Sequence, residues 1–263
     1  MKVTVNGKEI ILKESISIKD LAELIKKEYD IVIYNGFPIN DIDTCLKEGD
    51  NIFFIKKCVI PDRDELEFLM ISRHTPNIYN KLKNSCVGIA GVGGLGSNVA
   101  IALARIGVGR IIIADFDVVE PSNLNRQQYF VKDIGRPKVE AIKETLGLIN
   151  PYVVVEANYL RLTPENIPYV FKDVKIVIEA FDRAEEKAML IKTCVNLGKI
   201  VIAASGLAGY GDNDSIVTRK INDNLYIVGD NESEAGIGLG LMAPRVMIAA
   251  AKQANLAVEI LLR

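Results

Sequence analysis

The chain has 263 residues, of which 49% are hydrophobic and 25% charged, so it carries enough apolar side chains for a sizeable core. Its formal net charge of −2 argues against a nucleic-acid-binding surface, which would require a basic excess on one face. No apolar run reaches the roughly 20 residues of a membrane span, and the first residues resemble a strand rather than a secretion signal, so we expect a cytoplasmic protein that binds no membrane.

Residues 1–57 have the pattern of a small β-grasp domain. Two short strands flank Asn6-Gly7, a dipeptide that favours tight hairpins. Ser17 is placed to cap a helix with apolar residues at helical spacing. Two further strands are expected at residues 31–34 and 52–55. A hairpin, a helix and two short strands predict a β-grasp fold for this segment.

Residues 58–84 are polar and helix-prone, and we interpret them as a linker with lead-in helices. Pro76 is expected to begin one of these helices, because proline suits the first helical position. From Cys86 onward, apolar strands alternate with helical segments. This alternation predicts a Rossmann-type α/β domain with a mostly parallel sheet at residues 85–263. The expected strands are 86–90, 110–114, 153–157, 175–179 and 200–204, and the expected helices are 95–106, 137–148, 184–196 and 242–262.

A glycine-rich loop follows the first strand of this second region. Gly91, Gly93 and Gly96 form a Gly-x-Gly-x-x-Gly pattern, in which glycines permit a tight turn and let the backbone approach phosphate. The next helix offers its N-terminal N–H groups to an anion. Asp115, at the end of the following strand, suits ribose hydroxyls. These features predict nucleotide binding, although a nicotinamide dehydrogenase would share them and a purely structural glycine loop stays an alternative.

The segment after Asp115 separates the nucleotide-dependent reactions. Asn123, Arg126 and Gln127 cluster there, and hydride transfer has no use for such a group. An enzyme that attacks the α-phosphate of ATP does, because positioned cations stabilise the charge on the phosphoryl oxygens. Arg126 supplies a planar fork of donors, and Lys138 supplies a point charge. The sequence therefore favours chemistry on a nucleoside triphosphate.

These motifs together resemble the ThiF/MoeB/HesA family, bacterial relatives of the ubiquitin-activating enzymes. The resemblance rests on Gly-x-Gly-Gly-Leu-Gly-Ser from Gly91, on Asp-x-Asp from Asp115 with the following Ser-Asn-Leu-Asn-Arg-Gln, and on Gly-Arg-Pro-Lys ending at Lys138. It covers essentially residues 81–263. The resemblance implies a nucleotidyltransferase that uses ATP to adenylate the C-terminal glycine carboxylate of a small, ThiS-like sulfur-carrier protein.

The resemblance also implies roles for matching positions. Asp115 would hold the ribose, while Arg126, Gln127 and Lys138 would contact the phosphates and Asn123 would order their loop. The implied nucleotide-binding set is Gly91, Gly93, Gly94, Gly96, Asp115, Asp117, Asn123 and Gln127. The implied catalytic set is Arg73, Arg126, Lys138 and Asp182.

Two of these catalytic positions have additional interpretations. Asp182 matches a family aspartate that supports Mg²⁺, and its place at the carboxyl end of a strand faces it toward the ligand crevice. It would equally suit the N-cap of the following helix. Arg73 is the candidate for an arginine that family members receive from the partner in a homodimer, although a solvated surface arginine is an equal alternative.

The N-terminal segment resembles ThiS in length and order, but it departs from ThiS at its end. Sulfur carriers of that family end in Gly-Gly, whereas here the strand continues into Lys56-Lys57-Cys58. This copy therefore cannot be the activated carrier. Docking, regulation and simple stabilisation of the fold all remain open as its role.

Cysteine placement narrows the expected chemistry. None of the four cysteines forms a CxxC pair, so we predict no zinc site. Residues 205–232, where some family members carry a sulfur-handling cysteine, contain none, so the reaction is expected to stop at the acyl-adenylate. Thiamine thiazole formation is the favoured pathway. The same activation of a molybdopterin-type or peptide-modifying carrier, and a non-catalytic carrier-binding scaffold, remain alternatives.

Overall fold

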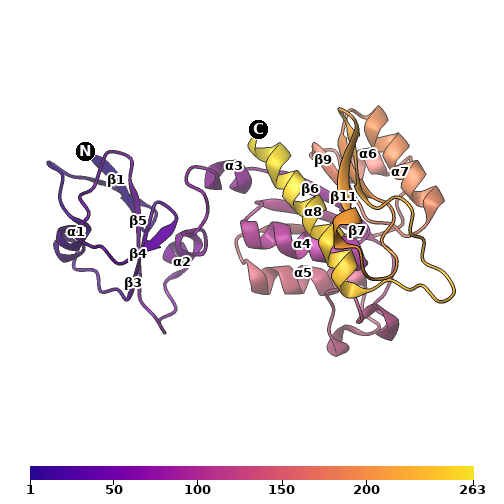
Figure 1. Ribbon diagram of the computed structural model, residues 1–263, viewed down its shortest axis with the longest axis horizontal. Coiled ribbons are helices and arrows are strands. Elements are labelled where there is room, and N and C mark those ends of the chain that lie inside the picture. The colour runs from indigo at the N-terminus through magenta and orange to yellow at the C-terminus, as the bar shows by residue number, and fades with distance from the viewer. The chain divides into compact units, whose positions relative to one another are not determined.

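The computed structural model describes residues 1–263, which form two compact units, Met1–Asn80 and Lys81–Arg263 (Figure 1). Each unit has its own sheet, of five and seven strands respectively. We describe each unit by itself. None of the helices is both long and apolar enough to span a membrane.

The first unit is a β-grasp sheet with the strand order β2-β1-β5-β3-β4. β1 pairs with β5 in parallel, and the other pairs are antiparallel. The elements are β1 (Lys2–Val5), β2 (Lys8–Ile11), α1 (Ile18–Leu24), β3 (Ile31–Tyr34), β4 (Phe37–Ile39) and β5 (Asn51–Ile55). The predicted β-grasp fold is confirmed, and β4 is an additional short strand that pairs with β3 across the Asn35-Gly36 hairpin.

Helix α1 is capped as expected and buries its apolar face. The Ser17 side chain accepts from the Asp20 N–H at 3.1 Å, and the Asp20 carboxylate accepts from the Ser17 N–H at 3.3 Å, which completes a capping box. Ile18 and Leu21 are fully buried and belong to one core cluster with Phe54 of β5. Burial of these side chains against the sheet stabilises a helix that would be too short to form alone.

Residues 58–84 contain two helices, α2 (Arg63–Met70) and α3 (Tyr79–Lys83). α2 packs on the β-grasp unit: Glu65 accepts from Lys27 Nζ at 2.5 Å and from the Asn6 side-chain amide, and the Phe68 ring lies over Gly7. The expectation that Pro76 begins the second helix is wrong. α3 begins only at Tyr79, because Asn77 has a φ of 69°, in the left-handed region that an α-helix excludes.

The second unit is built on a seven-stranded sheet with the order β11-β12-β10-β9-β6-β7-β8. All neighbouring strands run parallel except β11 and β12. The strands are β6 (Cys86–Ala90), β7 (Arg110–Asp115), β8 (Val154–Tyr159), β9 (Ile176–Glu179), β10 (Ile200–Ala204), β11 (Val217–Asn222) and β12 (Leu225–Gly229). The predicted Rossmann-type sheet is confirmed, with β11 and β12 as additions at one edge.

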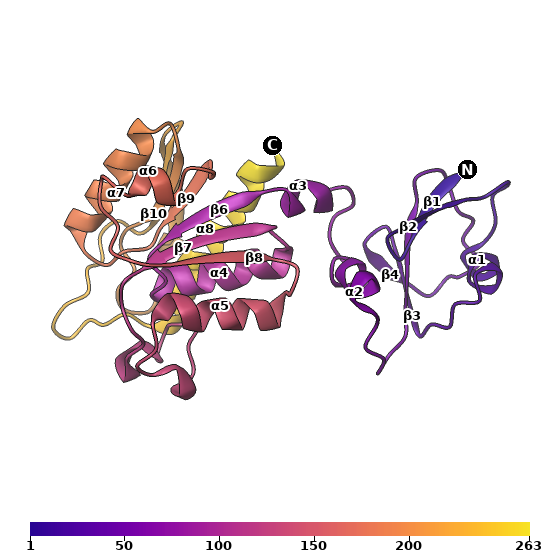
Figure 2. The same ribbon diagram turned by 180° about the vertical axis from the view of Figure 1, so that it is seen from behind.

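Helices cover both faces of this sheet (Figures 1 and 2). The five helices are α4 (Gly94–Ile106), α5 (Lys138–Ile149), α6 (Ile167–Val170), α7 (Ala184–Asn196) and α8 (Ala243–Leu262). α4 packs against α5 and α8, while α6 packs against α7. Burial from both sides explains the continuous apolar runs of the central strands, in which Ile89, Ile112, Val177 and Val201 are all buried.

The strand order places a topological switch point between β6 and β9. The chain proceeds from β6 to β7 and β8 on one side, and then returns to form β9, β10 and β12 on the other. In open parallel sheets a ligand crevice opens at such a point, outside the carboxyl ends of the strands. The glycine loop follows β6, and Asp182 follows β9, so both lie at this edge of the sheet.

Candidate active site

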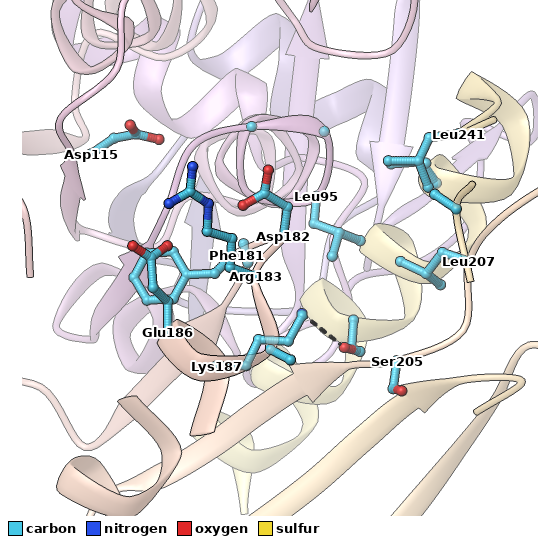
Figure 3. Close-up of a pocket in the computed structure, with 18 of the residues that line it drawn as sticks. Leu95, Asp115, Phe181, Asp182, Arg183, Glu186, Lys187, Ser205, Leu207 and Leu241 are labelled. Atoms are coloured by element: carbon cyan, nitrogen blue, oxygen red, sulfur yellow. Dashed lines mark hydrogen bonds between the residues drawn. The ribbon is translucent and has the colours of Figure 1, made fainter. Parts of the chain in front are cut away.

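A cavity of about 780 Å³ opens at the carboxyl edge of the seven-stranded sheet (Figure 3). This volume falls within the range of roughly 300–1,000 Å³ that is usual for small-ligand pockets. Its walls come from the segments that follow β6, β7, β8, β9, β10 and β12, together with the start of α8. The cavity therefore lies where the topology predicts a ligand site.

The glycine loop forms one wall, and two of its glycines are required by close backbone approach. Gly91 has a φ of 87°, and a Cβ there would lie 2.9 Å from the Ala180 carbonyl oxygen. A Cβ on Gly96 would lie 1.9 Å from the Gly91 carbonyl oxygen, so only glycine lets α4 approach the loop. Gly93 and Gly94 line the cavity at the N-terminus of α4, where the free N–H groups of the helix favour an anion.

Asp115 ends β7 with its carboxylate tied to the glycine loop. One oxygen (Oδ2) accepts from the Val92 N–H and the other (Oδ1) from the Asp117 N–H, both at 2.8 Å. The side chain lines the cavity, although the residue is only 9% exposed, and this burial raises the pKa of the carboxyl group. Each oxygen retains a lone pair, so the carboxylate can still accept from ligand hydroxyls.

Two cations with unused donors stand beside this carboxylate. Lys138 is the first residue of α5, and its Nζ makes one ion pair, to Asp117 Oδ2 at 2.9 Å. Arg126 uses one terminal nitrogen (Nη1), which donates to Asn125 Oδ1 at 2.8 Å and to the Ser122 carbonyl at 3.3 Å. Both side chains line the cavity. An ammonium group has three donors and a guanidinium has five, so both groups can donate to a phosphate as well.

The Asn123–Gln127 segment contributes differently at its two ends. Asn123 is buried outside the cavity lining, where its amide oxygen accepts from the Glu120 N–H at 3.1 Å and its carbonyl from the Gln127 N–H at 2.9 Å. It therefore orders the loop rather than facing a ligand. Gln127 lines the cavity, and its buried amide oxygen has no hydrogen-bond partner.

Asp182 lines the cavity after β9 with its carboxylate exposed to the open space. The N-cap of α7 is Arg183, and no side chain caps that helix, so the alternative interpretation of Asp182 as an N-cap is wrong. In the view of Figure 3, Asp182 lies between Asp115 on one side and Leu207 and Leu241 on the other. Its position between the two ends of the cavity suits contact with a reacting centre.

A divalent cation fits this site only together with a ligand. No group of three His, Cys, Asp or Glu side chains is arranged to hold a metal ion. Mg²⁺, however, commonly binds through one or two carboxylates, with waters and phosphate oxygens completing its octahedron. The Asp182 carboxylate, which does not cap α7, can serve as one such carboxylate ligand.

Arg73 belongs to the first unit, in the turn after α2, and its side chain is exposed. It is absent from the cavity lining. Its participation across a dimer remains a prediction.

Three further cavity residues escaped the sequence interpretation. Arg183 lines the cavity, and Figure 3 shows its guanidinium directed into the cavity beside Asp182. The guanidinium of Arg161 lies 4.7 Å from the ring centroid of Phe116. The only sequence signal for Arg183 was its adjacency to Asp182 at a strand end, and Phe116 similarly adjoins Asp115.

Lys187 also lines the cavity, but its donors are occupied. It donates to both carboxylate oxygens of Glu179, at 3.1 and 3.0 Å, and to the Ala204 carbonyl at 3.0 Å. Glu179 is completely buried, and this burial raises the pKa of its carboxyl group although Lys187 opposes the shift. Three acceptors match the three donors of an ammonium group, so Lys187 holds β9, β10 and α7 together.

The far end of the cavity has a different lining. It is formed by Ser205–Ala208 after β10 and Asn231–Ala235 after β12, with Leu241 just before α8 and Val246 in its second turn. We call these residues the distal arm, and the end with Gly91–Gly96 and Asp115 the nucleotide arm. Residues 205–208 have small or apolar side chains. In Figure 3, Leu207 and Leu241 lie on the side of the view away from Asp115.

The second unit combines a Rossmann sheet with a glycine loop, and it places a carboxylate suited to ribose beside cationic side chains with unused donors. These features define a nucleotide-binding protein of the α/β class. The chain belongs to the ThiF family, whose model matches residues 67–263. A second family model, of ThiS-like ubiquitin, matches residues 1–58. The expected resemblance is confirmed for both parts of the chain.

Curated relatives match part of the chain. The adenylyltransferase and sulfurtransferase uba4 of Emericella nidulans is 38% identical over 132 residues, which is 50% of this chain and 27% of that protein. The probable adenylyltransferase/sulfurtransferase MoeZ of Mycobacterium tuberculosis is 38% identical over 120 residues, 45% of this chain and 31% of that protein. The matched regions therefore span less than a third of these relatives.

Solved structures share the fold. The tRNA N6-threonylcarbamoyladenosine dehydratase TcdA of E. coli, in complex with ATP, superposes with a TM-score of 0.69 at 24% identity, over 77% of this chain and 96% of that chain. MccB of E. coli with ATP gives a TM-score of 0.56 at 25% identity, over 77% of this chain and 64% of that chain.

Proposed function

We propose that this protein is an ATP-dependent adenylyltransferase that activates the C-terminal glycine carboxylate of a small ubiquitin-like sulfur-carrier protein. The observation that carries the proposal is the two-armed cavity. One arm joins a ribose-type carboxylate to cations with free donors, and the other is a less charged pocket with room for a peptide end. Asp182 lies between the two arms, where a carboxylate and an α-phosphate would meet.

The reaction needs positioning more than proton transfer. A carrier carboxylate, ionised at neutral pH, forms a bond from its oxygen to the α-phosphorus of ATP. The bond from that phosphorus to the bridging oxygen breaks, and pyrophosphate leaves with the electron pair. Negative charge grows on the departing phosphates, where Arg126 and Lys138 have unused donors. Asp115 accepts from the ribose hydroxyls, and the N-terminus of α4 faces the phosphates.

Mg²⁺ is part of this proposal through Asp182. When bound, the ion would neutralise phosphate charge and help orient the triphosphate. Asp182 would hold it, and the guanidinium of Arg183 adds a second positive group at the same place.

The first unit supports one candidate pathway. Its match to ThiS-like ubiquitin supports a ThiS-like substrate and hence thiamine thiazole formation. A second candidate is a molybdopterin-type carrier, which is favoured by the match to MoeZ. The distal arm contains no cysteine, so in either case the product is the acyl-adenylate and another protein supplies sulfur. We also propose a cytoplasmic homodimer in which Arg73 of each copy reaches the phosphates of the other.

Carrier-dependent exchange of pyrophosphate into ATP tests the proposal. With a Gly-Gly-ended carrier added, exchange should appear, and Arg126→Ala should abolish it. The matched control is the same carrier without its last glycine, which should support no exchange. Exchange that proceeds without carrier, or that is absent with both the ThiS-type and the molybdopterin-type carrier, would contradict the proposal.

A further inference from the structure

Arg245 is a buried arginine in the first turn of α8, and the proposed chemistry makes no use of it. It is 7% exposed, and it is absent from the cavity lining. A cation at a helix N-terminus is opposed by the helix dipole. A buried charge in such a place needs strong compensation from specific partners.

The partners of Arg245 come from the segments that follow two different strands. After β10, the carbonyls of Gly211 and Asp212 accept from one guanidinium nitrogen (Nη1), at 2.6 and 3.1 Å. After β12, the Asp230 carboxylate accepts from the other (Nη2) at 2.6 Å. The side chains of this ion pair are only 8% and 10% exposed. One guanidinium therefore ties both segments to the start of α8.

Asp230 extends the connection into the distal arm itself. The oxygen that does not face Arg245 accepts from the N–H groups of Glu232 and Ser233, both at 2.8 Å. A Cβ on Gly206 would lie 1.8 Å from the same oxygen, so the Ser205–Ala208 segment packs directly on this carboxylate. These contacts outweigh the effect of burial and hold the pKa of Asp230 below its ordinary value.

Every segment of the distal arm thus meets at one ion pair, whereas none of the hydrogen bonds of this pair goes to Gly91–Gly96 or Asp115. We propose that Asp230 and Arg245 are positioning residues that shape the distal arm and thereby set the affinity for the carrier tail, without affecting ATP. The inference rests on the proposed function, in which the distal arm receives the tail. Neither residue lines the cavity, so both act through the loops that they hold.

Separate Michaelis constants for carrier and ATP, measured by pyrophosphate exchange, test this inference. Asp230→Asn keeps the shape of the side chain and an oxygen for the two N–H groups, but it removes the charge that Arg245 requires. The KM for carrier should rise at least about tenfold, equivalent to about 1.4 kcal/mol. The Kd for ATP, measured by calorimetry, should stay within about twofold. Arg245→Gln should give the same split, and the double variant should be no worse than either single variant, because the two residues act as one unit.

The matched control is Lys220→Met. Lys220, on the exposed strand β11, forms an ion pair of similar length, 2.7 Å to Asp223, and its loss should leave both constants unchanged. If Asp230→Asn does not fold, Arg245→Lys is the substitute. It keeps the buried positive charge but loses the planar guanidinium that donates through two nitrogens. A parallel rise in the ATP constant, or an unchanged carrier KM, would overturn the inference. Absence of carrier-dependent exchange in the wild-type protein would instead overturn the proposed function.

Discussion

The two arms of the cavity are built in different ways. In the nucleotide arm the backbone forms the shape: Gly91 and Gly96 permit close contacts, and Lys138 and Arg126 keep unused donors. In the distal arm buried side-chain charges form the shape, through the Asp230–Arg245 pair. Glu179 and Lys187, near the segment that carries Asp182, form a second ion pair with a buried carboxylate that joins separate segments.

This contrast distinguishes charged side chains that can still contact a ligand from those whose hydrogen bonds are all used within the protein. Lys138 and Lys187 both line the cavity and both pair with a carboxylate. Lys138 has one protein acceptor, whereas Lys187 has three and can offer nothing more to a ligand. The number of unused donors therefore distinguishes a lysine that can still donate to a ligand from one that cannot, although both line the same cavity.

The largest effect on stability is expected at Lys187. Lys187→Met leaves the fully buried Glu179 without a counter-charge, which costs about 3–5 kcal/mol in the free energy of unfolding. Because burial raises the pKa of Glu179 in the folded state, the loss should be small while this carboxyl group is protonated, and it should grow only as the pH rises through that raised pKa. Urea denaturation across this pH range measures it. Adding Glu179→Gln should recover most of the loss, and no recovery would contradict the structural role.

Lys138→Met should affect activity instead. The apolar stem of methionine fills the same space, while the donor for phosphate is lost, so the rate of exchange should fall about 10²–10³-fold. The free energy of unfolding should change little, since the Asp117 partner of Lys138 is half-exposed. The assignment of Lys138 to activity and Lys187 to stability would be contradicted by either of two results. One is that Lys138→Met unfolds the protein, and the other is that Lys187→Met lowers the rate of exchange with no loss of stability.

A smaller effect on stability is expected from loss of the Asp230–Arg245 ion pair, and this effect should depend on pH. Hydrogen bonds to a charged group contribute about 1.5–3 kcal/mol, so Asp230→Asn should lose a comparable amount at neutral pH. The folded-state pKa of Asp230 is lowered, so its contribution is present above the ordinary value of 3.8 and is lost as the pH falls below that value. The difference between wild type and variant should therefore shrink below pH 3.8 in acid denaturation followed by circular dichroism. A difference that stays constant there would exclude this pair as its source.

The smallest effect is expected in the first unit, far from these charges in the sequence. Ser17→Ala removes the cap of α1 and should cost about 1 kcal/mol. Lys19→Met, two residues further along the chain, removes no cap and is the control. Both variants should leave exchange unchanged, and a loss of exchange in Ser17→Ala would give the first unit a part in catalysis.

Local signals made the fold and the nucleotide arm predictable. Central strands such as β6 and β10 are buried on both faces and appear as apolar runs, so their bounds agree with prediction. β11 was missed because its residues are almost all exposed and polar. The glycine loop, Asp115 and Lys138 lie within one compact stretch of chain, so their spacing was informative.

The distal arm could not be predicted for the opposite reason. Arg245 meets Asp230 across 15 residues and the Gly211 carbonyl across 34, and no motif joins these positions. Lys187 uses its last donor on the Ala204 carbonyl, which only the folded sheet brings near. Long-range pairing of charges leaves no periodicity in a sequence.

The most direct test of carrier adenylation is the mass of the carrier after incubation with this protein and ATP. We predict that a Gly-Gly-ended carrier gains one adenylyl group at its C-terminus, and that hydroxylamine converts this adduct to the hydroxamate. A carrier without its last glycine should gain nothing. An unmodified carrier, in the presence of protein that binds ATP, would contradict the proposed activity.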